Sequence, residues 1–148
     1  MAAKTLPSVA YFCMEYALES NFRIYAGGLG ILAGDYLKGA KEFGFPMVAI
    51  GMRWKQGYGE QFIDKNTGRP YDAYRNQAHE FLEDTGVIVK VPIKGRDVAV
   101  KVWRVDAFGV DSLYLLDTDI EENDAEARWI TGQLYGWFGE ERVAQEMV

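Results

Sequence analysis

Three glycines stand within four residues, at Gly27, Gly28 and Gly30, directly before a run of apolar residues with helical spacing. Glycine reaches backbone angles that side chains forbid, and it lets a ligand approach the main chain closely. A helix that begins here directs its unpaired N–H groups, and the positive end of its dipole, at the loop. The stretch therefore predicts a helix start that can hold a phosphate or another small anion.

The segments around this loop predict an α/β fold. Apolar runs at residues 9–14 and 47–52 are typical of buried strands. Between them, apolar residues recur with helical spacing over residues 29–43, and a glycine and a proline just beyond predict the end of the helix. Strand, glycine loop, helix and strand make a βαβ unit with parallel strands. We therefore expect a Rossmann-like βα core over residues 8–53.

The next part of the chain is rich in β-forming residues. Three such runs are separated by glycine-containing turns, which predicts an antiparallel meander; the runs are 87–93, 97–105 and 112–116. We expect a β-rich excursion from the core over residues 54–116. Trp54 and Tyr58 lie at its beginning.

A helical end is expected over residues 123–148. Asn123 or Asp124 can cap its first helix, which would bury three apolar residues, namely Trp129, Ile130 and Leu134. A second helix starts near Glu140, with Val143 and Met147 four residues apart. No stop signal follows, which is typical of a chain cut from something longer.

Composition excludes several classes of function. With 148 residues, 49% of them hydrophobic, the chain is one ordinary domain or part of a larger one. A net charge of -6 and a pI near 4.8 argue against a nucleic-acid partner. No apolar run approaches the ~20 residues of a membrane span, so no membrane partner is expected. Cys13 is the single cysteine, which suits a reducing cytoplasm.

Acidic residues offer two candidate sites. Glu15 follows the first predicted strand, where it can organise the glycine loop, face a sugar hydroxyl or form a structural salt bridge. Asp117 begins an acidic segment with the spacing of a calcium-binding EF-hand loop, but Glu122 and Arg128 replace the glycine and glutamate that such a loop needs. We interpret this segment as a solvated connection and expect no metal site.

The remaining residues with reactive or aromatic side chains have few possible roles. Cys13 lies in an apolar run and is expected to be a core thiol. His79 is the single histidine, so a histidine-based metal site is not predicted. Tyr11, Trp54 and Tyr58 form either a stacking surface for a sugar or planar cofactor, or part of the core.

The sequence resembles the N-terminal part of the α-glucan (glycogen/maltodextrin) phosphorylases. The resemblance is carried by residues 11–16 (YFCMEY) and 25–38 (YAGGLGILAGDYLK). Shorter matches continue it over most of the chain, at residues 44–46, 51–54, 115–119 and 142–146 together with Gly57. It is similar above all to the compact branch of the family, which has a short N-terminus.

The resemblance implies a fold and an activity. Such enzymes have the two-domain architecture of GT-B type glycosyltransferases, with Rossmann-like domains facing each other across a cleft, and they carry pyridoxal phosphate. They cleave α-1,4-glucan with orthophosphate to give glucose 1-phosphate. Residues 1–148 would then be an incomplete N-terminal domain, with glucan, orthophosphate and a C-terminal phosphorylase domain as partners. Assembly as a homo-oligomer is left open.

The resemblance also assigns site residues. Gly27, Gly28 and Leu29 match the substrate- and phosphate-binding loop, in which the Gly28 N–H faces the phosphate and Leu29 borders the glucosyl unit. Tyr11 would lie against the pyridoxal ring, so Tyr11 and Gly28 are the cofactor-binding candidates. Glu15 and Asp35 are candidates for a supporting role behind these residues, and no catalytic residue is assigned within the chain.

The sequence departs from the family pattern in three places. Ala26 replaces a polar residue of some members, and residues 135–139 (YGWFG) replace the usual Gly-Gly-Asp. The lysine that binds the cofactor and the basic residues that clamp phosphate belong to the C-terminal domain, and no lysine of this chain lies in a matching motif. We therefore expect the chain alone to be inactive.

Two other functions compete with the phosphorylase. A glycogen or starch synthase has a similar loop, but it places a lysine two residues before the first glycine, where this chain has Tyr25. A non-catalytic carbohydrate-binding or assembly module, left by truncation, is the alternative from another class. Activity that depends on a complementary C-terminal piece would distinguish the enzyme from the module.

Overall fold

The computed structural model describes residues 6–110, 113–136 and 139–148. Its elements in chain order are β1 (Val9–Phe12), α1 (Gly28–Glu42), β2 (Met47–Met52), β3 (Glu60–Ile63), β4 (Pro70–Ala73), β5 (Leu82–Ile93), β6 (Arg96–Val105), β7 (Leu113–Asp117), α2 (Ala125–Arg128) and α3 (Glu140–Met147).

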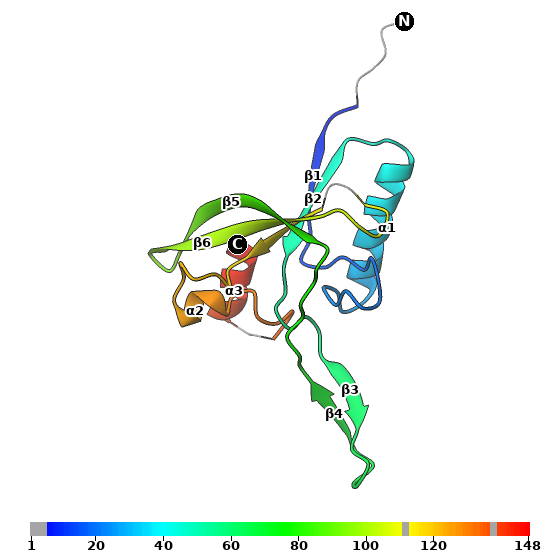
Figure 1. The fold of residues 1–148 in the computed structure, drawn as a ribbon, viewed down its shortest axis with the longest axis vertical. Helices are drawn as coiled ribbons and strands as arrows, with labels where there is room; N and C mark the ends of the chain where they lie inside the picture. The colour runs from blue at the N-terminus through cyan, green and yellow to red at the C-terminus, as the bar shows by residue number, and fades with distance from the viewer. Residues whose placement is uncertain (1–5, 111–112, 137–138) are drawn as a thin grey trace, which may run out of the picture.

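A five-stranded sheet in the order β1-β2-β7-β6-β5 organises the molecule (Figure 1). β1, β2 and β7 run parallel, whereas β6 is antiparallel to both β7 and β5. α1 connects the parallel pair β1 and β2. The predicted βαβ unit is thus confirmed, within a mixed α/β fold compatible with a Rossmann-like core.

The predicted antiparallel strands are part of this same sheet. β7 pairs with β2 on one side and with β6 on the other, so the meander extends the parallel strands without a break. Ser112, the predicted first residue of β7, lies outside the described residues. β3 and β4 form a separate two-stranded sheet, and Figure 1 shows this hairpin projecting away from the rest of the molecule.

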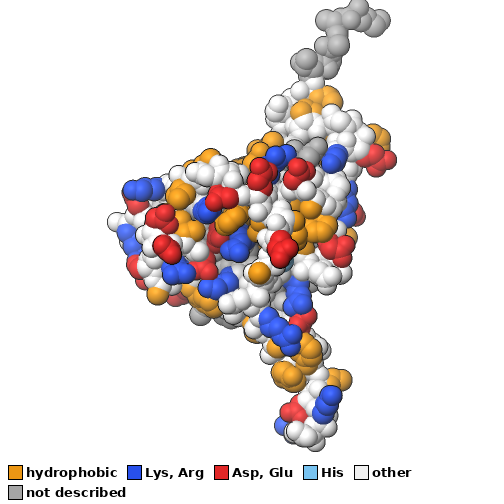
Figure 2. Space-filling model, viewed as in Figure 1, with side chains coloured by type: hydrophobic (Ala, Val, Ile, Leu, Met, Phe, Trp, Pro, Cys, Tyr) orange, Lys and Arg blue, Asp and Glu red, His pale blue; other side chains and the backbone are white. Residues whose placement is uncertain are grey.

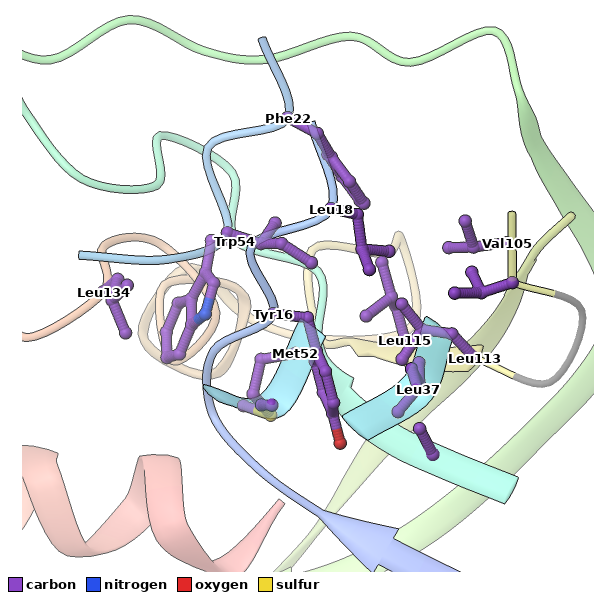
Figure 3. Close-up of a cluster of buried hydrophobic side chains, with 14 residues drawn as sticks. Tyr16, Leu18, Phe22, Leu37, Met52, Trp54, Val105, Leu113, Leu115 and Leu134 are labelled. Atoms are coloured by element: carbon purple, nitrogen blue, oxygen red, sulfur yellow. The ribbon is translucent and has the colours of Figure 1, made fainter. Parts of the chain in front are cut away.

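The main core lies between the sheet, α1 and the segment that joins β1 to α1 (Figure 3). Tyr16 and Phe22 of that joining segment are fully buried, as is Trp54 just after β2. α1 packs so closely on the segment that a Cβ added at Gly34 would lie 2.2 Å from the carbonyl oxygen of Ala17. A hydrogen bond from the Ala17 N–H to the Gly30 carbonyl, at 2.8 Å, holds the same contact.

The helical end differs from its prediction. Asp124 caps α2, where its side chain accepts a hydrogen bond from the Ala127 N–H at 2.9 Å, but the helix ends at Arg128. The predicted helix through Trp129 and Ile130 is therefore wrong, although Leu134 is buried.

The last helix also buries a different face from the one that its apolar residues indicate. α3 buries Ala144 and Gln145 and leaves Val143 and Met147 exposed. Gln145 can face the interior because its Nε2 donates to the carbonyl oxygens of Ile130 and Gln133, both at 3.0 Å. Within the described residues, no helix has the length and apolar character needed to cross a membrane.

We predict that Gly34→Ala destabilises the chain by about 3 kcal/mol, because the new methyl group would overlap the backbone of Ala17. Gly39→Ala in the same helix is the matched control. A Cβ at Gly39 meets nothing within 4 Å, so this substitution should raise the free energy of unfolding by about 0.5–1 kcal/mol. Urea denaturation measures both, and equal stability of the two variants would contradict the close contact.

Candidate functional site

The glycine loop ends where α1 begins. Gly27 is the residue before the helix, and no side chain caps the helix start. Gly27 and Gly28 are exposed, and a Cβ at either would meet nothing within 4 Å. Because the first N–H groups of a helix have no partner within it, the amides of Gly28 and Leu29 remain open to a ligand.

The glycines are not needed for the unusual backbone angles that we expected of them. None of Gly27, Gly28 and Gly30 is among the residues with a positive φ, so none needs a conformation that other residues avoid. Gly30 is instead required for space, because a Cβ there would lie 2.5 Å from the Cβ of Tyr25 and 3.0 Å from Glu15 Oε2.

A buried carboxylate shapes the loop from behind. Glu15 is 2% exposed. Its Oε2 accepts hydrogen bonds from the N–H groups of Ala26, at 2.8 Å, and Gly27, at 3.3 Å. Its Oε1 accepts a hydrogen bond from the hydroxyl of Tyr135. Of the three roles open to Glu15, the geometry corresponds to loop organisation, and the described residues give it no ion pair.

Tyr135 connects the loop to the helical end of the chain. Burial, followed by the hydrogen bond to Glu15, raises the pKa of Tyr135 to about 12. The guanidinium carbon of Arg142, in α3, lies 4.6 Å from the centroid of the Tyr135 ring. This gives a structural role to one residue of the unexplained segment 135–139, of which Trp137 and Phe138 lie outside the described residues.

A pocket of about 370 Å³ lies next to the loop, at the carboxyl ends of β1, β2 and β7. We call it the strand-end pocket. Its lining is mostly apolar and consists of Tyr11, Phe12, Cys13, Met14, Leu29, Ile50, Gly51, Met52, Leu116, Gln145, Glu146 and Val148. Carboxyl ends of parallel strands are the usual place for ligands in α/β sheets. The lining contains no lysine or arginine, so this part of the chain supplies no positive charge to an anion.

The structure brings some predicted site residues together and separates others. Tyr11 and Leu29 line the strand-end pocket, and Gly28 directly precedes Leu29. The Tyr11 ring packs edge-on against Tyr36, at 6.1 Å between centroids, and burial, followed by the neighbouring Cys13, raises the pKa of Tyr11. Asp35 is exposed on α1 and makes no hydrogen bond or ion pair with the described residues.

Of the two alternatives for Tyr11, Trp54 and Tyr58, the structure supports the core for Trp54 and shows no shared stacking surface among the described residues. Trp54 is buried in the core and donates from Nε1 to the carbonyl oxygen of Met14 at 2.8 Å. Tyr58 is half exposed and lies just before the β3–β4 hairpin. Only Tyr11 of the three lines the pocket. Cys13 is partly buried and lines it too.

Gln145 is a site residue that sequence reasoning did not single out as such. It lines the strand-end pocket, and its Oε1 is buried with no hydrogen-bond partner among the described residues. A buried acceptor without a partner is costly and suits a ligand hydroxyl or N–H. No sequence signal indicated it, because the apolar spacing of Val143 and Met147 places Gln145 on the other face of the helix.

The acidic segment is only in part the solvated connection that we expected, since Glu121, Glu122, Asp124 and Glu126 are exposed but the first residues are not. Asp117 is buried and paired with Arg53, whose Nη1 lies 2.8 Å from Asp117 Oδ2. Asp119 pairs with Lys55 and Arg128, at 2.6 Å and 2.7 Å. No group of three or more His, Cys, Asp and Glu side chains in the described part of the chain is arranged to hold a metal ion.

The fold and the pocket define an α/β domain with a candidate ligand site at the carboxyl edge of its parallel strands. No protein-family model matches the chain. The relatives with named activities include two phosphorylases. The maltodextrin phosphorylase of Thermococcus litoralis is 37% identical over 148 residues, covering 95% of this chain and 18% of that enzyme. The glycogen phosphorylase of Mycobacterium tuberculosis is 34% identical over 163 residues, covering all of this chain and 18% of that enzyme.

A third relative has no assigned function. It is an uncharacterized protein of Methanocaldococcus jannaschii, 40% identical over 141 residues, which cover 94% of this chain and 27% of that protein. The chain is thus homologous to part of the glycogen and maltodextrin phosphorylases, which confirms the predicted family. It spans between 18% and 27% of the length of these relatives, consistent with an N-terminal part.

We predict that Tyr135→Phe lowers the free energy of unfolding by about 1–2 kcal/mol at pH 7, because Glu15 loses a buried donor. The pKa of Tyr135 is raised above its ordinary value of 10, to about 12. Its contribution is therefore complete below pH 10 and is lost as the pH rises toward 12. Denaturation at pH 7 and at pH 12 should show a smaller difference between the variant and the original chain at pH 12.

Tyr74→Phe is the control for this measurement. Tyr74 is half exposed, and its hydroxyl makes no hydrogen bond with the described residues. The control should change neither the stability at pH 7 nor its loss in alkali. A similar effect of both substitutions would contradict the role of the Glu15–Tyr135 contact.

Proposed function

We propose that the chain supplies one wall of the active site of an α-1,4-glucan phosphorylase, which cleaves glycogen or maltodextrin with orthophosphate to give glucose 1-phosphate. The observation that carries this proposal is the start of α1. There, the exposed Gly27 and Gly28 leave backbone N–H groups open beside the strand-end pocket. The homology to named phosphorylases supports the assignment of these donors to phosphate.

Each residue on this wall of the active site is assigned a role that its backbone or side chain can perform. The Gly28 N–H donates to a phosphate oxygen, where fixed donors stabilise charge that builds up in the reaction. Leu29 gives the glucosyl unit an apolar edge, and Gln145 Oε1 accepts from one of its hydroxyls. Glu15 acts on the loop alone, because both of its oxygens already accept hydrogen bonds within the chain.

The residues of the pocket fit pyridoxal phosphate in part. Tyr11 offers a ring at the pocket wall against which the planar cofactor can lie. No lysine lines the pocket, so covalent attachment requires a residue from elsewhere in the enzyme. When bound, the cofactor supplies a phosphate group that acts as acid and base beside the substrate phosphate.

The complete enzyme in this proposal has the GT-B arrangement of two domains and acts in the cytoplasm.

The absence of lysine and arginine from the strand-end pocket determines what the chain can do by itself. A phosphate held only by neutral N–H donors, with Glu146 nearby, lacks the positive charge that normally holds it. We therefore expect the chain alone to bind phosphate or the cofactor weakly and to turn over no glucan.

The decisive experiment incubates the chain with maltodextrin and orthophosphate, with and without the C-terminal domain of a related phosphorylase, and measures glucose 1-phosphate. Product only with both parts supports the proposal. Product from the chain alone would contradict the missing half of the site. No product with either mixture would favour a non-catalytic carbohydrate-binding or assembly module. Glucan elongation from a nucleotide sugar would favour a synthase, although Tyr25 stands where its lysine would be.

We predict that Gly28→Pro lowers kcat in the complemented enzyme by about 10²-fold, the usual effect of removing one such donor. Proline is tolerated at the first position of a helix, where it removes the N–H and adds a ring. Gly28→Ala retains the N–H and is the matched control, since its methyl group meets nothing within 4 Å. Equal losses in both variants would show that space, and not the donor, is what the reaction requires.

A further inference from the structure

A second pocket, of about 490 Å³, lies between residues 19–23, residues 75–81 and Phe108. We call it the hairpin-base pocket, because residues 75–81 directly follow β4 of the projecting hairpin (Figure 1). It shares no lining residue with the strand-end pocket. Its volume is within the range of small-molecule sites.

The walls of this pocket are joined to each other by the protein itself. Gln77 Oε1 accepts from the Arg23 N–H at 3.0 Å, and Gln77 Nε2 donates to the Arg23 carbonyl oxygen at 3.3 Å. A Cβ at Gly57 would lie 2.0 Å from the same carbonyl oxygen, so the backbone of Gly57 is in close contact with that of Arg23. The two walls therefore do not depend on a ligand to bring them together.

The rim of the pocket carries an arginine, Arg75, and a carboxylate, Glu19, neither of which makes an ion pair with the described residues. Arg23 pairs with Glu60, and Glu19 accepts hydrogen bonds from the N–H and hydroxyl of Ser20, both at 2.8 Å. Arg75 has no carboxylate partner among the described residues, and its guanidinium carbon lies 5.3 Å from the centroid of the Phe62 ring. Figure 2 shows Lys and Arg side chains gathered where the hairpin joins the body, in a chain of net charge -6.

The stacked guanidinium is suited to an oxyanion. The ring contact orients one face of the Arg75 group, while its N–H edges remain available. A guanidinium edge matches the geometry of a carboxylate or a phosphate with two parallel hydrogen bonds.

The floor of the pocket is aromatic. The rings of Phe81 and Phe108 meet edge to face at 4.9 Å, and His79 lies 4.7 Å from the ring of the buried Phe22. Burial, followed by the charge of Arg53, lowers the pKa of His79, so the imidazole is neutral at pH 7. Its Nε2 is buried without a hydrogen-bond partner among the described residues. Such a floor accepts a flat or apolar body.

We propose that the hairpin-base pocket binds a small organic anion, with the carboxylate or phosphate group on Arg75 and an aromatic body on Phe81 and Phe108. Neither feature alone defines the ligand. The guanidinium of Arg75 provides the contact for an anion, and the aromatic floor selects one that carries a ring. This site is separate from the glycine loop and does not depend on the function proposed above.

Calorimetric titration of the chain with phenyl phosphate and with benzoate tests the proposal, since the two anions share a ring and differ in the charged group. Saturable binding of either supports it, and the tighter one identifies the preferred oxyanion. Benzyl alcohol and orthophosphate, which lack the charge and the ring respectively, should bind at least tenfold more weakly. Failure of both anions to bind, or equal binding of benzyl alcohol, would overturn it.

Arg75→Ala should weaken binding of the preferred anion at least tenfold. Arg69→Ala, on the same hairpin and with no side-chain hydrogen bond, ion pair or ring contact among the described residues, is the matched control and should leave binding unchanged. Gly28→Pro should leave it unchanged as well, which separates this site from the glycine loop. Because His79 is the single histidine, its ring protons give one resolvable set of NMR signals, and these should shift on binding. Equal weakening by both arginine variants would contradict the site.

Discussion

The buried carboxylate of Asp117 holds together the edge of the sheet on which the site is built. Asp117 is 1% exposed. Its Oδ2 accepts from Arg53 Nη1, at 2.8 Å, and from Trp103 Nε1, at 3.0 Å. Its Oδ1 accepts from the Asp119 N–H at 2.9 Å and the Thr131 hydroxyl at 3.3 Å. One side chain thus connects the ends of β2 and β7 to β6 and to the turns after α2. Breaking such a buried pair by removing one partner typically costs about 3–5 kcal/mol.

Glu15 repeats this construction near the end of β1, on the other side of β2. Asp117 is the last residue of β7, Glu15 comes three residues after β1, and both are buried, with oxygens that accept from donors in segments distant in sequence. Asp117 fixes the sheet edge, and Glu15 fixes the loop that begins α1. The backbone N–H groups of Gly28 and Leu29 are thereby positioned by charges that never face the ligand. Rigid support from behind is what allows neutral donors to act on an anion with little reorganisation.

The helices and strands that could be predicted are those determined by residues close together in the sequence. Apolar runs and helical spacing located β1, α1 and β2, and the parallel pairing followed from the connection between them. The position of α2 was correct in its cap at Asp124 but not in its length, because Trp129 and Ile130 turn back toward the sheet. α3 was predicted from apolar spacing, yet it buries Gln145 and exposes Val143. Hydrogen bonds from Gln145 to the carbonyl oxygens of Ile130 and Gln133, in the segment before α3, accompany a buried face that differs from the one hydrophobicity alone indicates.

The site was harder to predict than the fold for the same reason. The sequence indicated Glu15 as a possible organiser of the loop, but it could not show that Glu15 and Asp117 are buried, because their donors include Tyr135 and Arg53, 120 and 64 residues away. The stacking hypothesis failed because Trp54 finds its own acceptor in the core. Residue type alone does not show whether an aromatic ring faces a ligand or another side chain.

The glycine stretch can now be divided by what each glycine does. Gly30 and Gly34 are required where α1 presses against the segment before it, because a Cβ at either would overlap atoms at 3.0 Å or less. Gly27 and Gly28 face open space, and neither contact nor φ requires glycine there. Packing therefore accounts for one pair and leaves the other unexplained by the fold. What this pair contributes is a set of unpaired backbone N–H groups at a helix start that no side chain caps, which is why the exposed pair, and not the whole motif, carries the functional argument.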